Sequence, residues 1–196
     1  TVTRRDGLRY AFDPTGRLIS ETDRNGNSLT FAYSGTDLTT ITDSVGRTVS
    51  LTVDAARHIT RLSDPIGRTI TYGYDVGGRL ASVTDVRGGI TAYTYDAGGR
   101  LATITDQNAH VVVTNTYDAT GRMVAQVDAR GFNSTFAYDS ITGTTTMTDS
   151  RGGAWVDTYS GTALVARRDP LGNTTRYTYD AAFNRTSVTD PRGASV

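Results

Sequence analysis

The sequence repeats itself with a period of 21 residues. Residues 95–107 read YDAGGRLATITDQ, and residues 74–86 read YDVGGRLASVTDV. An Asp recurs along nearly the whole chain at steps that alternate between about ten and about eleven residues, after Tyr, Phe or Val and then after Thr, Ser or Val. Such repetition is typical of stacked units that cannot bury their apolar faces alone. We therefore predict a single repeat array over residues 1–196, with about nine repeats.

The recurring Asp marks a turn in each half of the repeat. Gly usually follows it three residues later, and an Asp side chain can accept backbone N–H groups ahead of it while Gly adopts the positive φ that closes a tight turn. We call the two kinds Y-D turns and T-D turns. The structural turn residues assigned on this basis include Asp13, Gly16, Asp75, Gly78, Asp85, Gly88, Asp96, Gly99, Asp118 and Gly121.

The segments between the turns are predicted to be strands. They are five to seven residues long, as in LASVT at 80–84 and ITAYTY at 90–95, and are rich in β-branched and aromatic residues. The chain has no Lys and only one Glu, so it lacks the usual residues of helix surfaces. We predict an all-β fold, a long antiparallel meander of about eighteen strands that curls into a spiral or partial shell because twist accumulates.

The odd repeat length constrains the strand register. Side chains alternate between faces with a period of two, so one hairpin of each repeat must contain one extra, bulged residue. We place it in the loop of the Y-D turn, which sets Tyr74 opposite Leu80 and Tyr95 opposite Leu101. This placement puts the following residues on the face opposite the tyrosines: Val83, Ile104 and Val188.

Charge and composition argue against several function classes. Twenty Arg balance twenty acidic residues, so no net field attracts nucleic acid or an anionic membrane, and no apolar run is long enough for insertion. Cysteine is absent, and the two His, His58 and His110, lie about fifty residues apart, short of a zinc ligand set. Neither a nucleophile elbow nor a phosphate-binding loop is present. We expect no catalytic residues, no cofactor and no metal.

The Arg residues that follow the turn Gly have two interpretations. In the first, they support the sheet by pairing with a nearby Asp or lying against a neighbouring Tyr. In the second, aromatic rows and Arg form a surface on which sugar rings stack. The residues of that ligand surface are Trp155, Tyr93, Tyr95 and Arg100.

The pattern Y-D-x-x-G-R-L-x-x-x-T-D-x-x-G resembles the YD repeat of the Rhs family, which is shared with toxin-complex C subunits, wall-associated bacterial toxins and teneurins. It stands here as YDVGGRLASVTDVRG from Tyr74, YDAGGRLATITDQNA from Tyr95, YDATGRMVAQVDARG from Tyr117 and FDPTGRLISETDRNG from Phe12. The resemblance implies a β-ribbon that winds into a hollow shell, enclosing a toxin in bacterial members and supporting adhesion in teneurins. Nothing here matches the self-cleaving core of the bacterial members, because DPIG at 64–67 and DPLG at 169–172 are in register as ordinary turns.

These observations favour a non-catalytic segment of such a shell, secreted or at the cell surface as part of a larger bacterial protein. Its partners would be flanking repeats and an enclosed toxin domain. The alternatives are a recognition module for a glycan or a protein, and a filament built by strand pairing between copies. The chain begins and ends within its own pattern, so we expect a fragment whose outer strands, at 185–189 and 8–12, offer unpaired backbone groups.

Overall fold

The computed structural model describes residues 1–196 and contains nineteen strands and no helix. The predicted all-β meander is therefore confirmed, with one strand more than expected. Contacts divide the chain into two compact units, Thr1–Ala92 and Tyr93–Val196. No helix is present that could span a membrane.

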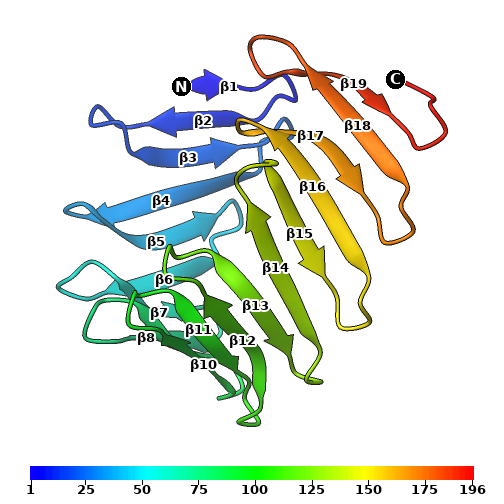
Figure 1. Cartoon of the computed structure of the whole chain (residues 1–196). Coiled ribbons are helices and arrows are strands. Elements are labelled where there is room, and N and C mark those ends of the chain that lie inside the picture. Colours follow the sequence, from blue (N-terminus) through cyan, green and yellow to red (C-terminus); the bar gives the residue numbers. More distant parts are fainter. The chain divides into compact units, whose positions relative to one another are not determined.

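The first unit is a run of antiparallel hairpins in chain order (Figure 1). Its strands are β1 (Val2–Thr3), β2 (Arg9–Phe12), β3 (Leu18–Thr22), β4 (Ser28–Ser34), β5 (Asp37–Asp43), β6 (Thr48–Val53), β7 (Ile59–Ser63), β8 (Thr69–Tyr74) and β9 (Leu80–Thr84). Strand β10 (Ile90–Tyr95) pairs with β9 through its first three residues and continues past the boundary between the units.

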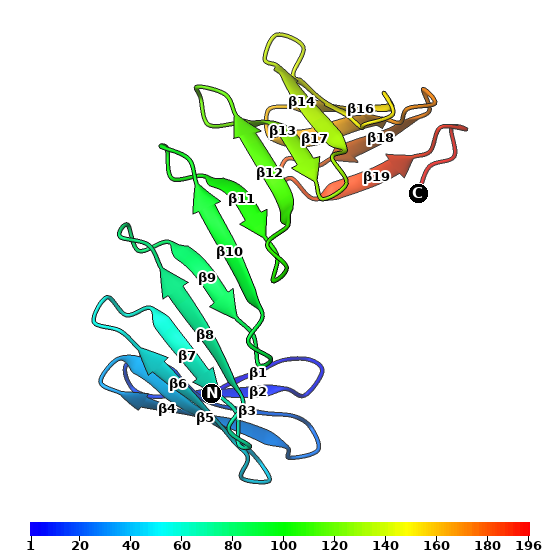
Figure 2. The same ribbon diagram turned by 90° about the horizontal axis from the view of Figure 1, so that it is seen from below.

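The second unit has the same construction, and its strands also lie side by side in chain order (Figures 1 and 2). They are β11 (Leu101–Thr105), β12 (Val111–Tyr117), β13 (Met123–Asp128), β14 (Asn133–Asp139), β15 (Thr144–Thr148), β16 (Ala154–Ser160), β17 (Ala163–Arg168), β18 (Thr174–Tyr179) and β19 (Arg185–Thr189). Because successive strands are antiparallel, Y-D turns and T-D turns lie at opposite ends of the strands in each unit.

In most repeats the extra residue lies in a strand rather than in a loop. The β14–β15 hairpin is different, because Tyr138 pairs with Thr145 and Asp139 with Thr144 without a bulge. Tyr74 faces Leu80, as predicted, but the next pair is Gly73 with Ser82, so Ala81 is the bulged residue. The same shift follows the Y-D turns at Phe12, Val53, Tyr117 and Tyr179. A bulge beyond Leu80 reverses the alternation of the remaining strand.

This position of the bulge corrects the predicted faces. Val83 lies directly opposite Tyr72, and Val188 lies directly opposite Tyr177, so both share a face with the tyrosines. Ile104 faces Val113, which stands on the same side of β12 as Tyr117. The prediction that Val83, Ile104 and Val188 face away from the tyrosines is wrong, because it assumed that the extra residue lies within the turn.

Each unit consequently has two chemically different faces. In the first unit, one face carries aromatic and aliphatic residues, including Phe31, Leu51, Tyr72 and Val83, and we call it the tyrosine face. The other, the threonine face, carries small hydroxyl residues. In the second unit the corresponding rows are Phe136–Met147–Trp155 on the tyrosine face and Thr135–Thr148–Ala154 on the threonine face.

Neither face is covered by a second layer. No residue of the chain is buried, and the accessible surface is 13057 Å². A compact protein of the same mass, 21.0 kDa, would expose about 9,000 Å². In β14 the tyrosine-face residues Phe136 and Tyr138 are half-buried and Thr135 and Ala137 are exposed, whereas in β9 and β15 the residues of both faces are half-buried. Large side chains shield one another across the strands, and no enclosed core forms.

The outer strands are less open than expected. In the first unit, β1 pairs with β2 through Val2–Tyr10 and Thr3–Arg9. In the second, the last residues return along β19, where Thr189 bridges to Ser195 and the Val188 and Val196 backbones exchange two hydrogen bonds of 2.8 and 3.1 Å. Short segments of the chain itself thus occupy part of both predicted edges, because the next hairpin of the repeat has begun at each end.

Candidate functional site

The turn aspartate organises each Y-D turn. In the Asp96 turn, Oδ1 accepts the backbone N–H groups of Gly98 and Arg100, each at 2.9 Å, and Oδ2 accepts Nε–H of Arg100 at 2.7 Å. Gly99 has φ +77° and donates its N–H to the Asp96 carbonyl at 2.9 Å. One carboxylate therefore closes the loop and fixes the guanidinium that follows it.

The other assigned turn residues lie in the same geometry. Oδ1 of Asp13, Asp75, Asp85 and Asp118 accepts the N–H groups two and four residues ahead. The Gly residues all have φ between +77° and +89°, namely Gly16, Gly78, Gly88, Gly99 and Gly121. In the T-D turns at Asp43 and Asp64, the Arg four residues later pairs with the carboxylate in the same way, at 2.6 and 2.5 Å.

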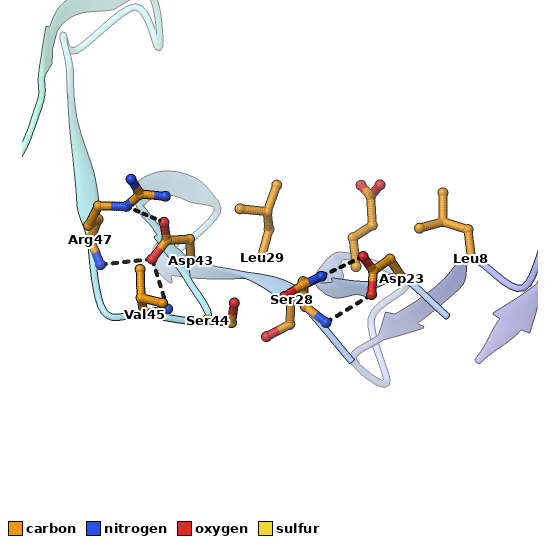
Figure 3. A pocket seen from close by; sticks show the side chains of 10 residues that line it. Leu8, Asp23, Ser28, Leu29, Asp43, Ser44, Val45 and Arg47 are labelled. Carbon is orange, nitrogen blue, oxygen red and sulfur yellow. Dashed lines mark hydrogen bonds and ion pairs between the residues drawn. The ribbon is translucent and has the colours of Figure 1, made fainter. Parts of the chain in front are cut away.

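Figure 3 shows two T-D turns of the first unit around a shallow hollow of about 390 Å³. Leu8 and Leu29 point to the same side; Leu29 lies between Asp23 and Asp43, and Leu8 lies on the other side of Asp23. Asp43 accepts hydrogen bonds from its own turn and from Arg47, so the dashed lines in Figure 3 stay within the turn. The hollow is a gap between repeats whose turn carboxylates are already satisfied.

In the Y-D turns that contain Arg17, Arg100 and Arg122, the guanidinium reaches the next repeat. The Arg100 guanidinium lies 4.8 Å from the ring centroid of Tyr117, and Nη1 donates to the Asp118 carbonyl at 3.2 Å. The same stacking joins Arg17 to Tyr33 at 5.1 Å and Arg122 to Tyr138 at 4.7 Å. We call each set of turn Asp, Arg and following Tyr a rung.

One rung contains histidine in place of arginine. The His58 ring stacks on Tyr74 with centroids 4.4 Å apart and planes inclined by 19°, and Nδ1 lies 3.3 Å from Oδ2 of Asp54. A flat ring replaces the flat guanidinium, so the rung keeps its stack. His58 thus has a structural contact on each side, and neither His58 nor His110 belongs to a cluster of metal-ligating residues.

The tyrosine hydroxyl completes the rung by replacing a missing ladder bond. Tyr33 donates to the Leu18 carbonyl at 2.8 Å, and Tyr117 donates to the Leu101 carbonyl at the same distance. Pairing of β3 with β4 begins only at Ser20, beyond the bulge, so the Leu18 carbonyl lies outside the hydrogen-bonded ladder between β3 and β4. The tyrosine therefore closes the open end of the T-D hairpin in these repeats. The corresponding hydroxyls of Tyr74, Tyr138 and Tyr179 donate to Ile59, Met123 and Leu164.

The rungs hold their carboxyl groups in the ionised state. Backbone N–H donation from Arg100 is the main cause that lowers the pKa of Asp96, and the Arg100 side chain lowers it further. The pKa values of Asp13 and Asp118 are lowered most, because the hydroxyls of Thr15 and Thr120 also donate to them. A carboxyl group kept ionised by three or four donors is a poor general acid, so this chemistry is that of a structural clamp.

The four residues assigned to the ligand surface do not form one site. Tyr93 and Tyr95 lie on β10, and Arg100 lies in a rung. Trp155 lies on β16 in a hollow that none of the other three residues lines. The hollow is lined by Phe136, Thr145, Met147, Trp155, Asp157 and Arg167.

Asp157 and Arg167 were not singled out from the sequence, although a signal was present. Asp157 is an Asp outside the turn spacing, and Arg167 does not follow a Gly. The two residues face each other on β16 and β17 and form two hydrogen bonds of 2.7 Å, from Nε to Oδ1 and from Nη2 to Oδ2.

A family model described as RHS Repeat matches residues 12–48, 53–90, 78–110 and 160–195, well over half of the chain. A search of curated proteins gives no significant match. The matches overlie most of the turns described above, and the turn at Asp118 lies outside them.

Several solved toxin-complex structures are similar to the chain. The crystal structure of TcdB2-TccC3-Cdc42 has a TM-score of 0.60 and 14% identity, over 96% of this chain and 13% of that chain. TcdB2-TccC3 without its hypervariable C-terminal region has a TM-score of 0.59 and 14% identity, over 93% and 13%. The Tc holotoxin pore of Photorhabdus luminescens with the TccC3 mutation D651A has a TM-score of 0.56 and 15% identity, over 96% and 13%. The likeness is one of fold, and the chain spans about 13% of the length of the chains it matches.

Proposed function

The chain belongs to the RHS-repeat family, and from this we propose that it is a non-catalytic stretch of a repeat wall that encloses or scaffolds another polypeptide. The observation that carries the proposal is the layer itself. It is one sheet thick in each unit, has no buried residue and presents two different faces. Such a layer separates two spaces, whereas an enzyme needs a closed pocket around its reacting groups.

The rungs stabilise the layer. A single sheet cannot gain stability from a core, so it depends on contacts between successive strands. Each rung ties a turn to the next repeat through an ion pair, a stacked ring and a hydroxyl bond, as in Asp96–Arg100–Tyr117. Because the rungs recur in both units, we treat residues 1–196 as one array whose flanking repeats continue the wall.

The enclosed partner in this proposal is a toxin domain of the same parent protein. The similar structures are toxin-complex assemblies, and the chain matches only a small share of each of their chains. The parent would be a larger bacterial protein that is secreted or displayed at the cell surface. The turn carboxylates have a structural role in this proposal, because each already accepts hydrogen bonds within its own turn, as Asp96 does from Gly98 and Arg100.

Protease protection of the full-length parent protein tests the proposal. The segment enclosed by the wall should be cut more slowly in the parent than when it is expressed alone. Replacing Tyr117 and Tyr138 by Ala should speed its cleavage, because both rungs are then lost. Thr135→Ala on the exposed threonine face is the matched control and should leave the rate unchanged. Equal cleavage of the enclosed and the free segment would contradict the proposal.

A further inference from the structure

The Asp157–Arg167 pair differs from the ion pairs of the turns. Turn pairs such as Asp96–Arg100 and Asp43–Arg47 join residues four apart and close a loop. Asp157 and Arg167 instead join two neighbouring strands on the tyrosine face, where most repeats place aromatic or aliphatic side chains. Two other repeats carry polar residues in that row, in the pairs Asn115–Gln126 and Tyr10–Glu21, but neither forms an ion pair there. The ladder of β16 and β17 continues on both sides without them, so strand pairing alone does not require the pair.

The pair forms the polar wall of the Trp155 hollow, which has a volume of about 430 Å³. Phe136, Met147 and Trp155 follow one another across three strands and form the apolar wall. Thr145 lies beside them in the next row, opposite Asp157, and its small side chain leaves the space open. Trp155 is 38% exposed, so a large part of its surface is available to a ligand.

Three classes of ligand fit the lining poorly. A nucleic acid could stack on Trp155, but its phosphates would require unpaired cations, and the charge of Arg167 is balanced by Asp157. A metal ion would find a single carboxylate that already accepts two bonds from Arg167. A purely apolar peptide would leave the remaining hydrogen-bonding capacity of the ion pair unsatisfied.

A sugar ring fits both walls. Its C–H face packs on an aromatic plane, and its hydroxyls both donate and accept hydrogen bonds. Asp157 supplies acceptors and Arg167 supplies donors within one bidentate pair, so two adjacent hydroxyls can be bound without a net charge. The volume also lies within the usual range of small-ligand sites, about 300 to 1,000 Å³.

We propose that the Trp155 hollow binds a neutral pyranose ring of a glycan. This role goes beyond the proposed wall function, because it gives one segment of the wall a specific ligand. Trp155 is the stacking platform, and Asp157 and Arg167 select for ring hydroxyls. The site lies wholly within the second unit.

The single Trp of the chain makes the site directly observable. The intact chain is titrated with methyl glycosides of glucose, galactose and N-acetylglucosamine and with their β-linked oligomers, and Trp fluorescence is recorded. A saturable change with at least one sugar is expected, with a Kd on the order of 1 mM for a single ring. An oligonucleotide and an apolar peptide serve as competing ligand classes and should give no response.

Variants separate recognition from folding. Asp157→Asn and Arg167→Lys should each weaken sugar binding about tenfold or more while the circular dichroism spectrum is unchanged. Thr135→Ala on the threonine face should bind as the unmodified chain does. The proposal is overturned by the absence of any sugar response, by unchanged affinity in both folded variants, or by a response only to the oligonucleotide or the peptide. Because the titration follows one hollow of the isolated chain, its outcome is independent of whether the parent protein encloses a toxin.

Discussion

At the level of single residues, the turn aspartate and the tyrosine of the next repeat perform linked tasks. The carboxylate of Asp118 accepts two backbone N–H groups and also fixes the guanidinium of Arg122. That guanidinium stacks on Tyr138, whose hydroxyl then satisfies the Met123 carbonyl outside the ladder. The Tyr, Asp, Gly and Arg residues of the sequence motif thus form one connected set of bonds across two repeats.

Tyr74 and Tyr72 allow the hydroxyl bond to be measured within one strand. Both lie on the tyrosine face of β8, and the Tyr74 hydroxyl donates to the Ile59 carbonyl at 2.8 Å. Tyr74→Phe should lower the free energy of unfolding by about 1 kcal/mol, because it leaves that carbonyl without its donor. Tyr72→Phe, the control, should change the stability little. Equal effects in urea titrations would show that the hydroxyl bond does not stabilise the rung.

Ala109 occupies a turn position that favours glycine. Its φ is +61°, and Arg57 and Phe183 take the same left-handed conformation in their turns. Ala109→Gly should therefore raise the free energy of unfolding by about 0.5 to 1 kcal/mol. This is the relief of the left-handed strain minus the cost of the greater freedom of glycine in the unfolded chain. Thermal unfolding measures the change.

Gly88→Ala is the reverse substitution and the matched control. Gly88 has φ +86°, and an added Cβ would meet no atom within 4 Å, so only the backbone conformation is tested. The expected loss is about 1 kcal/mol. Stabilisation by Gly88→Ala would contradict the role assigned to positive φ in these turns.

At the level of strands and hairpins, the bulge decides which side chains share a face. The odd repeat length predicted one extra residue per repeat, and the pairing of Tyr74 with Leu80 followed correctly from the sequence. The sequence did not reveal whether the extra residue lay in the loop or at Ala81. Both positions satisfy the parity of the repeat, but only the bulge at Ala81 brings Val83 to the tyrosine face.

Deleting Ala81 should be far more damaging than shortening its side chain. Without this residue the β8–β9 hairpin would pair without a bulge, and Val83 would turn to the threonine face. We expect loss of cooperative unfolding in the deletion, monitored by circular dichroism. Ala81→Gly keeps the residue count and should cost no more than about 1 kcal/mol. A deletion variant as stable as Ala81→Gly would refute the role of the bulge.

The limits of sequence reasoning are also clear at the candidate site. The turn positions could be predicted because Asp and Gly act locally, through bonds within five residues. The contact of Arg100 with Tyr117 was foreseen only as one of several options, since it depends on the strand register. Trp155 and Asp157 lie two residues apart on β16, but Arg167 lies on β17, so its position beside them depends on the strand register and could not be derived from spacing alone.

The turns together predict a distinct response to acid. The pKa values of Asp13, Asp75, Asp96 and Asp118 are lowered in the folded chain, chiefly by hydrogen bonds from turn hydroxyls and backbone N–H groups. A carboxyl group whose pKa is lower in the folded chain stabilises that chain fully when the pH is above the pKa of the unfolded chain, 3.8. This stabilisation is lost as the pH falls through the pKa of the folded chain. The melting temperature should therefore be nearly constant from about pH 7 to about pH 5 and fall below about pH 4. A constant melting temperature through that lower range would contradict the clamp.

At the level of the whole molecule, stability must be distributed along the chain. Each strand pairs with its neighbours in sequence, and no buried core connects distant repeats. Repeat proteins of this kind behave as a sum of local units and nearest-neighbour interfaces. A wall built in this way can lengthen by adding repeats, because each addition brings its own stabilising contacts.

Hydrogen exchange can distinguish this distributed stability from a cooperative core. Tyr33→Ala removes the hydroxyl bond to Leu18 and the stack with Arg17, so amides of β3 to β5 should lose protection. Amides of β8 and β9, in the same unit but several strands away, should exchange as before, because neither contact reaches them. Exchange followed by mass spectrometry under native conditions resolves the two regions. If protection fell equally in β3 to β5 and in β8 and β9, the first unit would unfold as one body, and the nearest-neighbour account of the wall would fail.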